Sequence, residues 1–253
     1  MALRIYVTGR VSAEVDGQVV IDERGFRGKQ GRLLFAYLVS ERSRPVAKEE
    51  VASVLWPEDQ SDTWEAALSA LTSRLASLIS SAGLEAQGMS FSRQFGQYQL
   101  RPPSDGWVDI EAGTSAIDRA EAAVRSGDAR NALGPAAVAA SIARRTFLPG
   151  VEGFWRESLQ GKLDRQLIRA LDCLGEMQLE IGEPQTALES ALEAVKLDPY
   201  RERTHRALLR AYAANGNRAK AVAAYHEFRE LLAAEVGTDP ESETEALYLE
   251  ILD

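Results

Sequence analysis

The sequence predicts an α+β module at the amino-terminal end, followed by an all-α module built from repeated helical pairs. Three observations lead to this fold class. Apolar residues alternate with polar ones early in the chain, which is typical of β-strands. A helical period then replaces the alternation, and beyond the stretch RPPSDGW the chain becomes rich in Ala, Leu and Glu and repeats itself. The two predicted modules are residues 1–104 and 105–253.

The first module is expected to begin and end with β-hairpins. Val11, Ala13 and Val15 alternate with polar neighbours, and Asp16-Gly17 follows as a strong signal for a two-residue hairpin turn. Near the end of the module, Gly96 separates two short runs with apolar and aromatic residues, which predicts a second hairpin.

Three helices are predicted between these hairpins, from Lys29, over 48–55 and over 63–79. Asp62 is expected to cap the third helix, with Glu65 completing a capping box. The apolar stripe of this helix recurs at steps of three and four residues and consists of Leu68, Leu71, Leu75 and Leu78. Strands, three helices and a final hairpin, in this order, predict a winged helix-turn-helix.

The second module contains an internal repeat. Leu174 matches Leu208, Gly182 matches Gly216 and Ala187 matches Ala221, each 34 residues further along the chain. This period is typical of tetratricopeptide units, in which Gly allows the turn between two helices and Ala lies where the helices cross closely. The sequence therefore predicts an all-α, tetratricopeptide-like repeat domain.

Composition and charge narrow the class of protein. The net charge is −9, with 45% hydrophobic and 26% charged residues, which is typical of a globular protein. Residues 1–104 hold 12 basic and 12 acidic side chains, so the whole negative excess belongs to residues 105–253. No apolar run is long enough to span a membrane, and the start lacks the order of a signal peptide. The single cysteine, Cys173, excludes an internal disulfide and favours a cytoplasmic location, with a buried thiol.

The two modules together resemble one family of bacterial regulators. The matching stretches of the first module are GKQGRLLFAYLV, VASVLWPE, TSRLASLI and FGQYQL. Those of the second are VDIEAG, LDPYRERTHRALLRAYAANGNRAKAVAAYHEFRELLAAEVGTDP and ALYLEIL. In this order they resemble the Streptomyces antibiotic regulatory protein type of transcriptional regulator, which joins an OmpR-like winged helix to a bacterial transcriptional activator domain.

The resemblance carries expectations about function. It implies that the third helix enters the major groove of duplex DNA and that the second hairpin, the wing, touches the adjacent minor groove. It implies that the helical module mediates homodimerisation and contacts the RNA polymerase holoenzyme. It further implies an activator that binds direct repeats in promoters, in a short form without an appended sensor module. No cofactor is expected.

The third helix supplies few side chains for reading DNA. Its outward face is nearly bare, with Ser69, Thr72 and Ser73 expected to hydrogen-bond base edges or phosphates, and Arg74 expected to bind a phosphate. Hydroxyl groups discriminate bases poorly compared with a bidentate Arg or Asn. We therefore expect recognition to rest on phosphate contacts and DNA shape more than on base-edge hydrogen bonds.

Basic residues near this helix are the other candidate DNA contacts. Arg42, Arg44 and Lys48 cluster at the turn into the second helix, whose first amides are expected to point outward as a phosphate site. Arg93 lies near the tip of the predicted wing, where a minor-groove contact is expected.

Two other classes of function are weighed against DNA binding. The bare third helix and the acidic second module also fit a protein-interaction scaffold whose winged helix no longer binds DNA. An enzyme finds little support, because the sequence has no Gly-x-Ser-x-Gly motif and no Gly-rich phosphate loop. No metal site is expected either, since His205 and His226 stand apart from any Cys or repeated carboxylate pattern.

Overall fold

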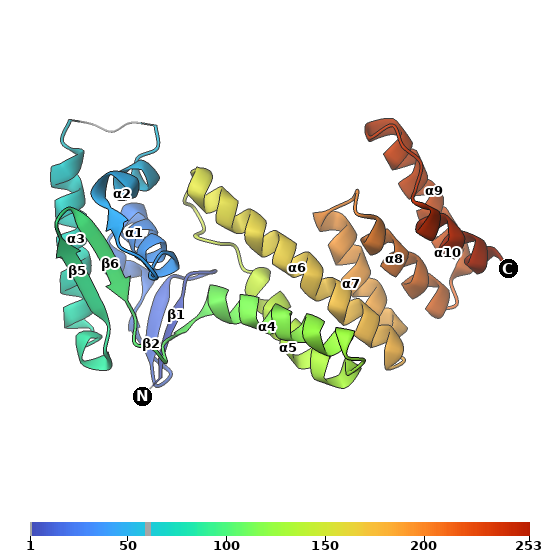
Figure 1. Ribbon diagram of the computed structural model, residues 1–253, viewed down its shortest axis with the longest axis horizontal. Coiled ribbons are helices and arrows are strands. Elements are labelled where there is room, and N and C mark those ends of the chain that lie inside the picture. The colour runs from blue at the N-terminus through green and yellow to red at the C-terminus, as the bar shows by residue number, and fades with distance from the viewer. Residues whose placement is uncertain (1, 59–61) are drawn as a thin grey trace. The chain divides into compact units, whose positions relative to one another are not determined.

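The computed structural model describes residues 2–58 and 62–253 (Figure 1). The chain forms two compact units. Unit 1 comprises Met1–Ala112 and Arg145–Lys162, and unit 2 comprises Gly113–Arg144 and Leu163–Asp253. Within the described residues, none of the helices combines the length and apolar character that a membrane crossing requires.

Unit 1 opens with a four-stranded sheet in the order β3-β2-β1-β7. Its strands are β1 (Leu3–Tyr6), β2 (Ser12–Val15), β3 (Gln18–Ile21) and β7 (Trp107–Val108). Asp16 and Gly17 both have positive φ, 50° and 82°, so they form the two-residue hairpin turn that the sequence predicts. β7 pairs parallel to β1. The Asp109 carboxylate that follows β7 accepts bonds from the Val7 and Thr8 amides at 3.0 and 2.9 Å.

Three α-helices, a second sheet and two 3-10 turns complete the first part of unit 1. The helices are α1 (Lys29–Ser40), α2 (Lys48–Leu55) and α3 (Trp64–Ser81), and the strands are β4 (Val46–Ala47), β5 (Ser90–Gln94) and β6 (Gln97–Arg101). The 3-10 turns are η1 (Glu23–Phe26), before α1, and η2 (Glu85–Gln87), after α3. The second sheet has the order β4-β6-β5, and its β5–β6 hairpin is the wing. Leu34, Phe35 and Leu38 of α1 are fully buried at the centre. This order of elements is the predicted winged helix-turn-helix (Figure 1).

The buried face of α3 differs from the predicted stripe. Leu68, Thr72, Leu75 and Ile79 are buried, whereas Leu71 and Leu78 remain partly exposed. The predicted capping box is also wrong, because the helix begins at Trp64 with Thr63 in the cap position. The carboxylate of Glu65 instead accepts a hydrogen bond from the Lys48 ammonium group.

Unit 2 contains helices only among its described residues. The helices that build it are α4 (Asp109–Arg125), α5 (Ala129–Ala143), α6 (Phe154–Glu180), α7 (Pro184–Leu197), α8 (Glu202–Ala214), α9 (Arg218–Glu235) and α10 (Ser242–Leu252). The first residues of α4 and α6 belong to unit 1. Small side chains line the core between α4, α5 and α6, where Ala116, Ala120, Ala136 and Ala140 are fully buried. Such side chains let the helix backbones approach closely.

The predicted repeat corresponds to two helix turns of the same geometry. At Gly182 (φ 82°), the amide of Glu183 donates to the Gln178 carbonyl at 2.7 Å. At Gly216 (φ 70°), the amide of Asn217 donates to the Tyr212 carbonyl at 2.9 Å. Both are Schellman motifs, which need a residue in the left-handed conformation and therefore favour glycine. Ala187 and Ala221, each 1% exposed, occupy matching places in the helices that follow.

Candidate nucleic-acid interface

The exposed face of α3 carries small side chains and one arginine. Ser69, Ser73 and Ser77 are exposed along it, and Arg74 is exposed beside them. Thr72 is only 2% exposed, and its hydroxyl donates to the Ser69 carbonyl at 3.1 Å. This burial corrects the prediction for Thr72, because its side chain is not available to base edges or phosphates.

The wing lies against this face of α3. The Arg93 guanidinium donates to the Ser73 hydroxyl at 3.3 Å and also lies 5.8 Å from the centre of the Phe91 ring. At the tip of the wing, the Lys48 amide donates to the Gly96 carbonyl at 2.9 Å. The hairpin tip, the start of α2 and the middle of α3 therefore share one surface of unit 1.

Carboxylates pair with all three residues of the predicted basic cluster. Arg42 forms a two-pronged ion pair with Glu111, and Arg44 bonds Glu50 at 3.0 Å as well as Glu41. Lys48 Nζ lies 2.7 Å from Glu65 and 3.9 Å from Glu49. The hydrogen bond that Arg44 donates to Glu50 raises the pKa of Arg44, and the one that Lys48 donates to Glu65 raises the pKa of Lys48. These ion pairs offset the positive charge that a phosphate would meet.

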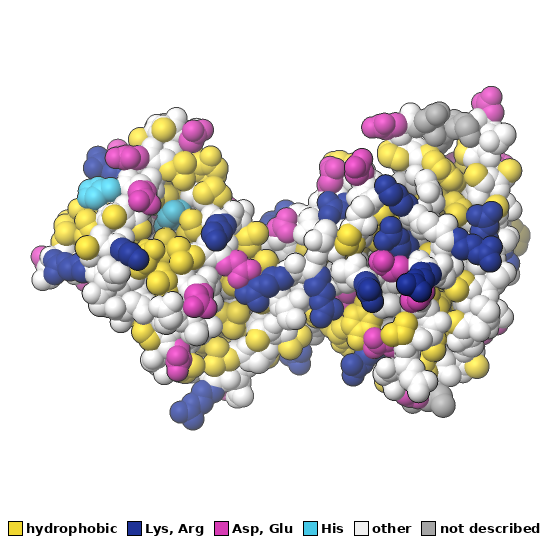
Figure 2. Space-filling view, turned by 180° about the vertical axis from the view of Figure 1, so that it is seen from behind, with side chains coloured by type: hydrophobic (Ala, Val, Ile, Leu, Met, Phe, Trp, Pro, Cys, Tyr) yellow, Lys and Arg dark blue, Asp and Glu magenta, His cyan; other side chains and the backbone are white. Residues whose placement is uncertain are grey.

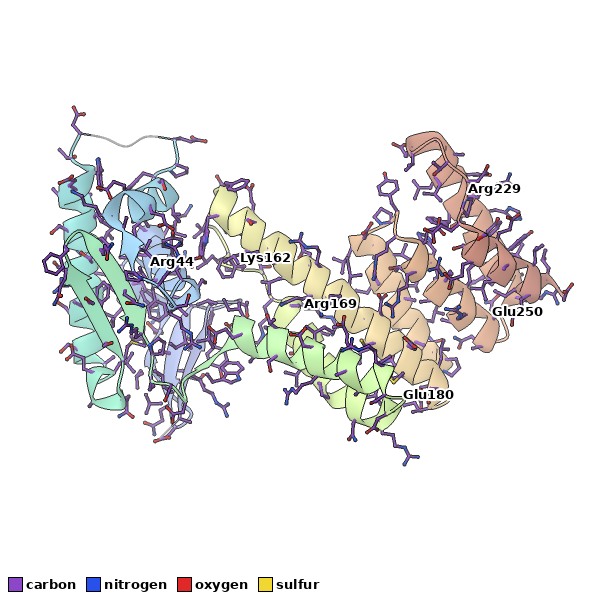
Figure 3. The ribbon with its side chains drawn as sticks, viewed as in Figure 1. Arg44, Lys162, Arg169, Glu180, Arg229 and Glu250 are labelled. Carbon is purple, nitrogen blue, oxygen red and sulfur yellow. The ribbon has the colours of Figure 1, made fainter. Side chains whose placement is uncertain are left out.

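The amino terminus of α2 is also less open to anions than the sequence predicts. The Lys48 amide is already bonded to Gly96, and Glu49 and Glu50 occupy the first turn of the helix. Their negative charges oppose a phosphate at this end of the helix. Figure 3 labels Arg44, which lies in the turn between α1 and β4.

Arg74 and Arg93 differ from the basic cluster. For neither guanidinium does a carboxylate lie within 4.0 Å, as far as residues 2–58 and 62–253 are concerned. Both side chains are exposed, one on α3 and one on β5, and Arg93 donates a hydrogen bond to Ser73, the residue that precedes Arg74 on α3. Figure 2 shows unit 1 from behind the view of Figure 1, with basic and acidic side chains interleaved on that side. The pair Arg74 and Arg93 is thus the part of the predicted set that keeps its charge uncompensated.

A cleft beside α3 adds a basic residue that sequence reasoning missed. The cleft has a volume of about 470 Å³, and Arg27, Arg74, Ser73 and Ser77 are among its lining residues. Arg27 follows η1 in the left-handed conformation, with φ of 52°. No local signal marks it, because only the packing of η1 against α3 brings Arg27 to this surface.

Comparison with known proteins places the chain in a family. Residues 108–252 match the bacterial transcriptional activator domain (BTAD) family. The regulatory protein AfsR of Streptomyces coelicolor is 28% identical over 251 residues, which is 99% of this chain and 24% of AfsR. The transcriptional regulatory protein MoaR1 of Mycobacterium tuberculosis is 24% identical over 99% of this chain and 82% of MoaR1. The chain thus spans about a quarter of AfsR and most of MoaR1.

A solved structure has the same fold. The structure of Mycobacterium tuberculosis EmbR, in complex with a low affinity phosphopeptide, matches with a TM-score of 0.85 and 23% identity. The match covers 99% of this chain and 65% of the EmbR chain. The chain belongs to the bacterial transcriptional activator domain family, as a regulator of the Streptomyces antibiotic regulatory protein type with an amino-terminal winged helix.

Proposed function

We propose that this regulator binds duplex promoter DNA through unit 1 and activates transcription through unit 2. In unit 1 the exposed face of α3 faces the major groove, and the wing follows the adjacent minor groove. The observation that carries this proposal is that Arg93 of the wing contacts Ser73, the neighbour of Arg74 on α3, and that both arginines are exposed and without an ion-pair partner among the described carboxylates. Two such guanidinium groups on one surface can bind phosphate groups of the DNA backbone.

Recognition of the DNA sequence rests on shape and on few base contacts. Ser69, Ser73 and Ser77 are the exposed polar residues along the middle of α3, and hydroxyl groups discriminate bases weakly. Direct-repeat sites and a second copy of the chain compensate for this weakness, because two linked contacts multiply their affinities.

Unit 2 supplies the contacts with other proteins. Membership of the activator-domain family supports contact with RNA polymerase and self-association through the helices. A cleft of about 500 Å³ is lined by residues of α6, α7, α8 and α10, including Arg203, Arg206 and Arg210. Repeat helices commonly use such a concave surface for a protein partner.

Fluorescence anisotropy with a labelled duplex from the protein's own upstream region tests DNA binding. Arg74→Ala and Arg93→Ala are each expected to weaken binding about fivefold and to reduce the salt slope of log K by about one. Arg4→Ala is the matched control, because Arg4 is an exposed arginine on β1, in the other sheet of unit 1. Absence of binding at about 50 mM salt, or identical salt slopes for all three variants, would contradict the proposal.

A protein-interaction scaffold is the second candidate, favoured by one observation. The ion pairs of Arg42, Arg44 and Lys48 compensate most of the basic charge that was expected at the interface. If the chain is such a scaffold, it binds a stable protein partner, and duplex DNA does not displace that partner. Co-purification of the tagged chain, with and without nuclease treatment, separates the two functions.

A further inference from the structure

The tip of the wing presents a phenylalanine to solvent. Phe95 is 99% exposed, whereas the other aromatic residues of the wing, Phe91 and Tyr98, are only partly exposed. Its neighbours on the two strands, Gln94 and Gln97, are exposed and polar. A single apolar ring therefore projects from a hydrophilic turn.

The backbone at Phe95 is unusual for an aromatic residue. Phe95 has φ of 54° and Gly96 has φ of 71°, which makes the connection a two-residue turn with both residues left-handed. Asn, Asp and Gly are the residues that favour the first position of such a turn. The other two-residue hairpin of this chain follows the rule with Asp16-Gly17. Phe95 thus occupies a position that disfavours it, without gaining burial in return.

The turn that carries this ring is held firmly. Gln94 pairs with Gln97 across the hairpin, and the Gly96 carbonyl accepts the Lys48 amide at 2.9 Å. β6 also pairs with β4 through Ala47 and Gln97. Arg93, two residues before Phe95, reaches Ser73 of α3. The backbone of the turn is therefore held beside the start of α2, in a hairpin that also contacts the exposed face of α3 through Arg93.

We infer that Phe95 is a wedge that enters the minor groove and partly unstacks one base step. The inference rests on the proposed DNA-binding function and adds a specificity-determining residue to it. An apolar side chain can insert between stacked bases, and the polar groups and the guanidinium that flank it can contact the phosphates on either side of the minor groove. Pyrimidine–purine steps such as TA and CA unstack most easily, so the wing selects these steps by their deformability. A protein partner is less well matched, because the tip offers one isolated ring and no apolar surroundings.

The test uses the full chain and duplexes from its own upstream region, with 2-aminopurine replacing each adenine in turn. Wild-type protein is expected to raise the 2-aminopurine fluorescence at one step and to bend the duplex, measured by energy transfer between end labels. Phe95→Asn removes the ring and places a residue that favours this turn. It is expected to abolish both the fluorescence and the bending signal and to weaken binding roughly tenfold. Phe95→Trp is the matched control, because it keeps an aromatic wedge and should retain both signals.

The outcomes separate the inference from the proposed function. If Phe95→Asn binds, bends and unstacks the duplex as the wild type does, the wedge is wrong while DNA binding stands. If no duplex binds any variant, the proposed function itself fails. If Phe95→Asn loses only the binding of a co-purifying protein, the ring belongs to a protein contact and the wedge is overturned. Thermal unfolding of Phe95→Asn at or above the wild-type midpoint excludes misfolding as the cause of a loss.

Discussion

Lys48 Nζ lies 2.7 Å from Glu65 Oε1 and links the start of α2 to the first turn of α3. The ammonium group also lies 5.7 Å from the centre of the Trp64 ring. This exposed ion pair bridges the two helices of the helix-turn-helix at their surface. It also engages the Lys48 ammonium group, which would otherwise be free to bind a phosphate at the edge of the proposed interface.

Removing the carboxylate is therefore expected to strengthen DNA binding. Glu65→Gln leaves Lys48 without its closest partner and removes one negative charge from the interface. We expect the affinity to rise roughly threefold to tenfold and the salt slope of log K to steepen by about one. Anisotropy titrations over a series of salt concentrations measure both quantities.

The control removes the same charge elsewhere. Glu227 is an exposed residue of α9 in unit 2, and Glu227→Gln is expected to leave the affinity and the salt slope unchanged. Equal effects of the two substitutions would mean that overall charge, and not the Lys48–Glu65 pair, limits binding.

A buried ion pair is expected to stabilise unit 2. Asp172 Oδ2 of α6 lies 2.6 Å from Arg201 Nη1, and the Asp172 side chain is 5% exposed. Asp172→Ala leaves Arg201, which is only 29% exposed, without this partner. We expect a loss of about 2 kcal/mol in the free energy of unfolding. Urea unfolding followed by far-ultraviolet circular dichroism measures it.

Two comparisons sharpen this experiment. Glu176→Ala removes a carboxylate that is 53% exposed and 3.5 Å from Arg203, so it should cost at most about 0.5 kcal/mol. The chain has four tryptophans, and all lie within unit 1: Trp56, Trp64, Trp107 and Trp155. Tryptophan fluorescence therefore reports unit 1, and Asp172→Ala should leave that transition in place. A shift of the fluorescence transition by the full amount would contradict a local role.

Local signals in the sequence predicted the elements of the fold well. Asp16-Gly17 forms the predicted two-residue turn, because left-handed φ values select these residue types. Gly182 and Gly216 likewise mark helix ends through hydrogen bonds between residues at most five positions apart. The second helix covers 48–55 in both prediction and structure, since a proline follows closely.

Charge pairing could not be predicted in the same way. Arg42 pairs with Glu111, 69 positions away, and Lys48 pairs with Glu65, 17 positions away. The neighbouring sequence contains no signal for these contacts, so the sequence predicts a free cation at each position. The predicted buried face of α3 is wrong for a related reason. Steps of three and four residues also connect Leu68 with Thr72 and Ile79, and only tertiary packing decides which set is buried.

The thiol of Cys173 is expected to be inert in the folded protein. Cys173 is 3% exposed, and burial raises its pKa to about 11. A disulfide reagent at about pH 8 should react with it only when unit 2 unfolds, because the thiolate is the nucleophile. Ser126→Cys in a Cys173→Ser background provides an exposed thiol as the reference. Reaction of the native thiol at the rate of this reference would show that the site opens readily.

His205 is expected to make stability depend on pH below neutrality. His205 is 7% exposed, and its ring stacks on Phe228 with centroids 3.7 Å apart and has Nε2 2.8 Å from the Pro199 carbonyl oxygen. The carbonyl can only accept, so neutral His205 donates from Nε2. Burial lowers the pKa of His205 below its ordinary value of 6.5, although Glu202 and Asp198 oppose this shift.

The direction of the pH effect follows from this lowered pKa. Well above pH 6.5 the imidazole is neutral in both the folded and the unfolded state and contributes no pH dependence. As the pH falls from 6.5 toward the folded pKa, the unfolded chain binds a proton first, so the free energy of unfolding decreases. The slope reaches at most about 1.4 kcal/mol per pH unit. Urea unfolding at about pH 7.5, 6.5 and 5.5 measures it, within a window above most carboxylate titrations. His205→Gln should flatten the dependence of the free energy of unfolding on pH. His226→Gln, which replaces an exposed histidine, is the control and should preserve that dependence. The reverse pattern would contradict the role of His205.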